Sequence, residues 1–94
     1  MNAIEILKNR ESDIKRKFHL RRIGVFGSFA RGQERAESDV DVLVEFEEGH
    51  VTFDNYADLK FYLEDLFGRE VDLVTEDAIR PQMKESILSE ITYA

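Results

Sequence analysis

Cysteine is absent from the 94-residue sequence, and proline occurs only once, at position 81. Without cysteine the chain has no disulfide, no thiolate nucleophile and no sulfur-ligated zinc, which fits a reducing compartment. The sequence also lacks any run near the roughly 20 apolar residues that a membrane span needs, and its N-terminus lacks the apolar core of a signal peptide. We therefore expect a soluble, cytoplasmic protein with no membrane partner.

Basic residues are also scarce. Lysine and arginine total 13 against 20 aspartates and glutamates, so the formal net charge is -7. This balance argues against direct binding of nucleic acid by charge alone. The chain is 43% hydrophobic, which is enough for a core, and it contains no glycine- or serine-rich linker and no internal repeat. We expect residues 1–94 to form one domain, with no room for a second catalytic lobe.

Apolar residues recur with alternating helical and strand periods along the chain. Short runs rich in β-branched residues predict three strands, at residues 22–26, 39–46 and 70–74. Apolar residues at helical spacing, with turn residues at the ends, predict helices at residues 4–18, 28–31, 52–67 and 81–91. The alternation indicates an α/β or α+β fold, with a small three-stranded mixed sheet flanked by helices in the order α-β-α-β-α-β-α.

Gly27 and Ser28 separate the first predicted strand from the second helix. Gly27 lacks the Cβ that would block a ligand, and Ser28 at the expected N-cap offers a hydroxyl and a backbone N–H where anions are favoured. Arg31 can place a guanidinium against phosphate oxygens, and Arg35 is a second candidate. The turn therefore predicts a binding site for the triphosphate of a nucleotide, although plain helix capping is the alternative.

Three aspartates form the second part of the pattern. Asp39 and Asp41 leave the same face of the predicted strand, roughly 7 Å apart, and Asp72 faces away from its apolar neighbours on the third strand. Carboxylates this close repel one another unless a cation neutralises them, and hard oxygen ligands suit Mg²⁺. Two Mg²⁺ ions with Asp72 as general base would support nucleotidyl transfer with release of pyrophosphate. The alternative is an ordinary strand with a solvated face.

The segment GSFARGQERAESDVDVLVEF, residues 27–46, resembles the signature of the DNA polymerase beta nucleotidyltransferase superfamily, in its minimal nucleotidyltransferase branch. The later GREVDLV and the closing RPQMKESILSEITYA also resemble that branch. The resemblance implies that Gly27 and Ser28 form the nucleotide-phosphate turn. It likewise implies that Asp39 and Asp41 bind magnesium and that Asp72 is the third carboxylate.

Proteins of this branch are similar to antitoxins that pair with HEPN-domain toxins. The resemblance implies a hetero-oligomer in which AMP is transferred from ATP to a tyrosine of the toxin, which silences it. Two alternatives stay open: an antitoxin that only binds and occludes the toxin, and a small-molecule nucleotidyltransferase whose substrate domain is a separate chain.

The third predicted helix carries apolar residues around most of its circumference. Part of it, with Phe61 and Tyr62 as candidates, is expected to dock a partner protein, and coverage by the first or last helix is the alternative. His19 and His50 are isolated at the ends of predicted elements and receive no functional role.

Overall fold

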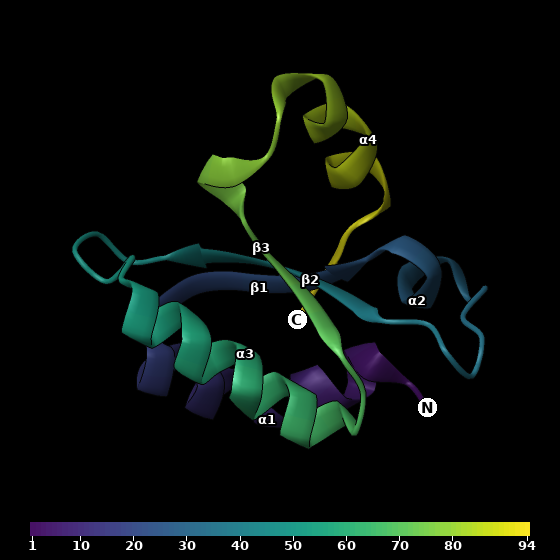
Figure 1. Cartoon of the computed structure of the whole chain (residues 1–94), viewed down its shortest axis with the longest axis horizontal. Coiled ribbons are helices and arrows are strands. Elements are labelled where there is room, and N and C mark those ends of the chain that lie inside the picture. Colours follow the sequence, from purple (N-terminus) through teal and green to yellow (C-terminus); the bar gives the residue numbers. More distant parts are fainter.

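The computed structural model describes residues 1–94 in full, and the predicted order of helices and strands is confirmed up to the last helix (Figure 1). The elements are α1 (Ala3–Phe18), β1 (Leu20–Phe26), α2 (Gly27–Arg31), β2 (Val40–Phe46), α3 (Phe53–Phe67), β3 (Val71–Thr75), the 3-10 turn η1 (Glu76–Ala78), α4 (Pro81–Glu90) and β4 (Thr92–Tyr93). None of the helices combines the length and the apolar character needed to cross a membrane.

The sheet is mixed, as predicted, with the strand order β3-β2-β1-β4. Strand β1 runs antiparallel to β2 and to β4, whereas β2 and β3 run parallel and are connected through α3. The register of this parallel pair sets Asp41 of β2 directly beside Asp72 of β3.

The prediction of three strands was wrong, because the chain forms a fourth strand, β4, directly after the last helix, where no strand was predicted. Helix α4 ends at Glu90, and Ile91 is already extended at φ -69° and ψ 140°. Thr92 then pairs with Val25, and Tyr93 pairs with Gly24. A β-branched and an aromatic residue suit a strand, but the pairing depends on β1, which is distant in sequence.

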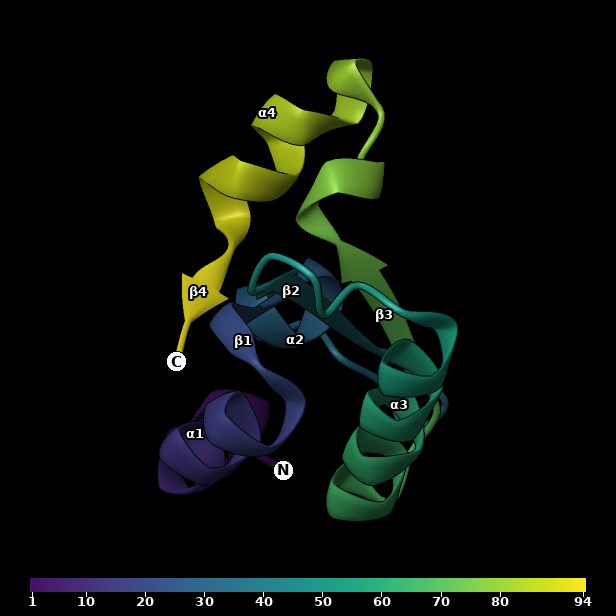
Figure 2. The ribbon, with the colours of Figure 1, turned by 90° about the vertical axis from the view of Figure 1, so that its left-hand side faces the viewer.

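Helices α1 and α3 lie together on one face of the sheet, and α4 lies on the other (Figure 2). The main core forms between the sheet and helices α1 and α3. Its 17 buried members are Ala3, Leu7, Ile14, Phe18, Leu20, Ile23, Val25, Phe29, Val40, Val42, Val44, Phe46, Leu59, Leu63, Phe67, Val71 and Leu73. Leu43, which leaves β2 on the same face as Asp41, is fully buried against Phe26 and Ile87. Helix α4 therefore makes that face partly apolar.

Helix α3 also protects the exposed edge of the sheet at β3. Tyr56 donates its hydroxyl to the carbonyl oxygen of Leu73 at 2.6 Å, and Glu64 accepts the N–H of Val71 at 3.1 Å. Edge strands with unpaired backbone groups invite pairing with other chains. These two side chains fix β3, and therefore Asp72, beside β2.

Candidate active site

Gly27 begins the turn between β1 and α2, directly against Asp41. Its φ is +71°, in the left-handed region that favours glycine. A Cβ at this position would lie 2.1 Å from Oδ2 of Asp41, far inside van der Waals contact. The sequence predicted close approach of a ligand at Gly27, and the structure places a carboxylate of the chain itself there.

The structure brings Asp41, Asp39 and Asp72 to the same end of the sheet. Asp41 and Asp72 are register partners on β2 and β3, and Asp39 directly precedes β2. Asp41 is half-buried, whereas Asp39 and Asp72 are exposed. Burial, followed by the negative charges of Asp72, Asp39 and Glu90, raises the pKa of Asp41 to about 6, while the positive charge of Arg31 acts in the opposite direction.

The donor set of this cluster fits a divalent cation. All three groups are hard carboxylate oxygens, and their mutual repulsion is the kind that a cation relieves. As the side chains stand, they do not converge, and no group of three histidine, cysteine or acidic residues is arranged so that it could hold a metal ion. Because Asp39 and Asp72 are exposed, their side chains have room to change rotamer toward an ion.

Arg31 lies at the end of α2, and its guanidinium lies close enough to Asp41 for its charge to act on that carboxylate. Its NH1 group donates to Oε2 of Glu90 at 2.8 Å, and its Nε donates to the side chain of Gln33 at 3.1 Å. Arg35, the second candidate, lies in the loop after α2 and is exposed. Of the two arginines, Arg31 is the one whose charge acts on Asp41.

Ser28 is placed differently from the prediction. It was expected to be the N-cap of the second helix, but α2 begins at Gly27, its N-cap is Phe26, and no side chain caps it. The reason is the left-handed Gly27, which turns the chain into the helix one residue early. Ser28 is half-buried in the first turn, next to the Gly27 amide.

Two residues of this region were missed by the sequence reasoning. Glu90, at the end of α4, accepts the N–H of Gly27 and the guanidinium of Arg31. Arg69 donates to the carbonyl oxygens of residues 35, 36 and 38, at 3.1, 2.9 and 3.2 Å, and thereby holds the loop that leads into Asp39. Both contacts join segments more than 30 residues apart, and no local pattern marks them.

An apolar hollow of about 240 Å³ opens beside the carboxylates, between β3, η1 and α4. We call it the Asp72 hollow; it is lined by Phe26, Asp72, Val74, Ala78, Ile79, Arg80, Met83 and Ile87. Asp72 is the one of the three aspartates that lines it.

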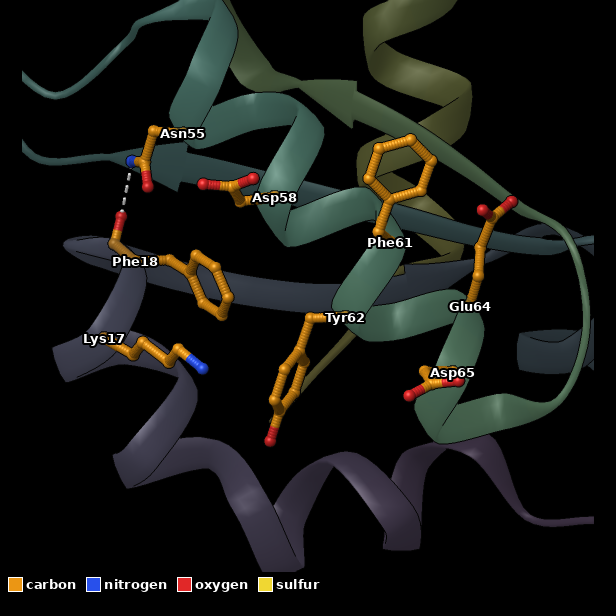
Figure 3. A pocket seen from close by; sticks show the side chains of 8 residues that line it. All are labelled: Lys17, Phe18, Asn55, Asp58, Phe61, Tyr62, Glu64 and Asp65. Atoms are coloured by element: carbon orange, nitrogen blue, oxygen red, sulfur yellow. Dashed lines mark hydrogen bonds between the residues drawn. The ribbon is translucent and has the colours of Figure 1, made fainter.

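A second hollow, which we call the α1–α3 groove, lies on the opposite face of the sheet (Figure 3). It is lined by Lys17, Phe18, Asn55, Asp58, Phe61, Tyr62, Glu64 and Asp65. The ring of Tyr62 packs edge-on against Phe18, with centroids 5.3 Å apart, so α1 covers this half of the expected docking pair. Phe61 stays 66% exposed at the side of the groove, among the acidic side chains of Asp58 and Asp65. The docking hypothesis thus narrows to Phe61.

His19 and His50 are isolated in sequence but adjacent in space. Their rings stack with centroids 3.8 Å apart, and Nδ1 of His19 lies 3.7 Å from a carboxylate oxygen of Glu47. The pair joins the end of α1 to the loop before α3, far from the three aspartates along the sheet.

Comparison with known proteins connects this geometry to a family. The chain matches the family described as nucleotidyltransferase domain over residues 5–94. It is 41% identical over 91 residues to a Methanocaldococcus jannaschii protein provisionally named a protein adenylyltransferase, covering 95% of this chain and 91% of the relative. It is 39% identical over 88 residues to the protein adenylyltransferase MntA of Thermococcus cleftensis, covering 94% and 88% of the two chains.

Solved structures share the fold. A protein provisionally described as a minimal nucleotidyltransferase aligns with a TM-score of 0.81 at 39% identity, covering 98% of this chain and 95% of the other. A toxin–antitoxin complex with AMP-PNP aligns with a TM-score of 0.75 at 20% identity, covering 92% and 70%. A complex of tri-AMPylated Shewanella oneidensis HEPN toxin with MNT antitoxin gives a TM-score of 0.68 at 18% identity, covering 95% and 69%. With a glycine turn, an arginine and three carboxylates at one end of a mixed sheet, this chain belongs to the nucleotidyltransferase domain family, in its minimal branch, and is a nucleotidyltransferase.

Proposed function

We propose that this chain is the antitoxin of a two-component pair and transfers AMP from ATP to a tyrosine of a HEPN-domain toxin, which neutralises it. The observation that carries the proposal is the placement of Asp39, Asp41 and Asp72 at one end of the sheet, beside the Gly27 turn and Arg31. Relatives named as protein adenylyltransferases support the reaction. The shared fold of an MNT antitoxin bound to an AMPylated HEPN toxin supports the partner.

On the nucleotide side, the Gly27 turn binds the triphosphate. The N–H of Gly27 and the guanidinium of Arg31 already hold one anion, the carboxylate of Glu90, so their geometry suits phosphate oxygens. Ser28, half-buried beside them, adds its hydroxyl and backbone N–H. These groups orient the α-phosphorus toward the carboxylates and bring no base specificity; the choice of ATP comes from the relatives.

Asp39, Asp41 and Asp72 would hold Mg²⁺, with two ions as the expected number. When bound, the metal supplies charge stabilisation for the phosphate oxygens and lowers the pKa of the attacking hydroxyl. The carboxylates supply the negative charge that keeps the ion between an acidic protein and an anionic substrate. Burial of Asp41 strengthens that attraction, because a charge partly removed from water is less screened.

On the acceptor side, Asp72 is the exposed carboxylate at the entrance of the Asp72 hollow. We assign it the role of general base. The tyrosine hydroxyl loses its proton to Asp72 and its oxygen bonds to the α-phosphorus, while the bond from that phosphorus to pyrophosphate breaks. The apolar lining of the hollow suits the ring of the tyrosine, with its hydroxyl directed to the carboxylates.

The acceptor and its positioning come from the partner chain in this proposal. Residues 1–94 act as one nucleotidyltransferase domain within a hetero-oligomer, and Phe61 beside the α1–α3 groove is the proposed contact with the toxin. A large exposed aromatic residue is a common anchor of protein interfaces.

The proposal is tested by incubating the purified chain with the cognate toxin, Mg²⁺ and ATP labelled at the α-phosphate. We expect label on the toxin, loss of labelling in Asp39→Asn and Asp72→Asn, and loss on chelation of the metal. The control is Glu48→Gln, which removes one negative charge from an exposed turn outside the site. Label that appears only on small molecules would contradict the choice of acceptor.

A further inference from the structure

Glu90 connects the C-terminal end of α4 to the turn that begins α2. Its Oε1 accepts the backbone N–H of Gly27 at 3.1 Å, and its Oε2 accepts NH1 of Arg31 at 2.8 Å. One carboxylate therefore accepts hydrogen bonds from both a main-chain amide and a guanidinium, as an anion does when two donors bind it. The side chain is about three-quarters buried in this position.

This carboxylate is out of place as a simple structural ion pair. Its negative charge faces Asp41, which already faces Asp39 and Asp72, so it adds a fourth acid to a cluster that repels itself. An ion pair with Arg31 alone could form without the Gly27 amide, yet the structure shows both donors taken. The contact thus places a further negative charge near Asp41 while satisfying the two groups that an entering anion needs.

We propose that Glu90 is a built-in competitor of the nucleotide: it holds the Gly27 amide and Arg31 in their anion-binding arrangement and is displaced when the triphosphate binds. This inference rests on the proposed function, because it takes these two donors to be phosphate ligands. A carboxylate and a phosphate oxygen accept the same hydrogen bonds, so neither donor is left unpaired during the exchange. Glu90 therefore sets the affinity for nucleotide without touching the reacting atoms.

The exchange has a defined consequence for the fold. Glu90 is the last residue of α4, and Ile91 leads directly into β4. Displacement of its side chain changes the surroundings of the backbone at Ile91 and Thr92, which link α4 to the edge of the sheet. Nucleotide binding should therefore be detected at the C-terminal segment as well as at the turn.

The test compares Glu90→Gln with Glu85→Gln by calorimetric titration of the Mg²⁺ complex of AMP-PNP into each full-length chain. Glutamine keeps the shape and one acceptor oxygen but removes the charge, whereas Glu85 is an exposed acid on the same helix with no partner in the structure. We expect Glu90→Gln to bind about three- to tenfold more tightly than the wild type, with Glu85→Gln within about twofold. Equal or weaker binding by Glu90→Gln would overturn the inference.

A second measurement uses the wild type and does not depend on any variant folding. In ¹H–¹⁵N spectra, addition of AMP-PNP with Mg²⁺ should shift the amide signals of Gly27, Ile91 and Thr92 together. A shift at Gly27 with no change at Ile91 and Thr92 would contradict displacement of Glu90. If the wild type binds no nucleotide at all, the proposed function fails, an outcome distinct from binding that is insensitive to Glu90.

Discussion

Gly27 shows how one missing side chain makes the site possible. Gly27→Ala would set a Cβ 2.1 Å from Oδ2 of Asp41 and strain a backbone at φ +71°. We expect a loss of about 2–4 kcal/mol in the free energy of unfolding, measured by chemical denaturation, and loss of AMP transfer. The control is Gly49→Ala, at φ +85° with no atom within 4 Å of the new Cβ, which should cost about 1 kcal/mol. Equal losses in the two variants would contradict the role given to contact with Asp41.

The half-buried carboxylate of Asp41 gives the metal-free protein a distinct pH dependence. Its pKa is raised from 3.8 to about 6, so the folded state holds the proton more tightly than the unfolded state. The free energy of unfolding should therefore fall as pH rises from about 4 to about 6 and stay lowered above that. The pKa difference corresponds to about 3 kcal/mol, which partial exposure to solvent reduces to about 1–2 kcal/mol.

Asp41→Asn isolates this effect from the other acids. At pH 7 without metal we expect the variant to be more stable than the wild type by about 1–2 kcal/mol in urea denaturation, while AMP transfer is lost. The difference should disappear near pH 4, where the wild-type carboxyl is protonated. A variant less stable than the wild type at pH 7 would show that Asp41 is not under electrostatic strain.

At the scale of the elements, the loop between α2 and β2 is held by one arginine, Arg69, from the connection between α3 and β3. Arg69 donates to three carbonyl oxygens of this loop, and its guanidinium lies 5.1 Å from the ring centroid of Phe29. Arg69→Ala should cost about 1–2 kcal/mol and speed amide hydrogen exchange in residues 35–39. Exposed Arg21, which has no ion pair in the structure, gives the control Arg21→Ala. Unchanged exchange in Arg69→Ala would mean that the loop is held by other contacts.

Elements with a local sequence pattern could be predicted, whereas those that depend on contacts between distant segments could not. The alternation of Val40, Val42 and Val44 with polar residues is local, so β2 and its aspartates were predicted close to their observed places. Strand β4 and the buried position of Leu43 both depend on segments that meet only in the folded chain. Local periodicity carries no information on such pairing, so β4 was not predicted.

In the candidate site, too, the residues that local sequence patterns mark were predicted, and those that act through contacts between distant segments were not. The turn and the three aspartates follow from local residue types and strand spacing, and the structure gathers them at one end of the sheet. Glu90 and Arg69 act through contacts between distant segments, and charged residues at helix ends and in loops are too common to single out. Ser28 was misplaced as a cap because a left-handed glycine is not evident from sequence.

For the whole molecule, the proposed docking surface at Phe61 gives a prediction about the partner. Phe61 is 66% exposed beside the α1–α3 groove, and truncation of an interface anchor typically weakens binding by more than 1 kcal/mol. We expect Phe61→Ser to weaken binding of the toxin about tenfold in a titration of the two chains, with AMP-PNP binding unchanged. The control is Glu48→Ser, an exposed position away from the groove. Toxin binding at wild-type affinity would assign the interface to another face.

The net charge of -7 has a different meaning once the site is described. Several of the chain's acids are gathered where an anionic nucleotide is proposed to bind, and the proposed Mg²⁺ would lie between the two sets of negative charges. The central claim is that this arrangement modifies the partner covalently. Its most direct test is the intact mass of the toxin after co-expression with this chain. We predict a mass increase by one or more AMP groups, which disappears with Asp39→Ala, whereas a toxin that is inhibited at unchanged mass would contradict the claim.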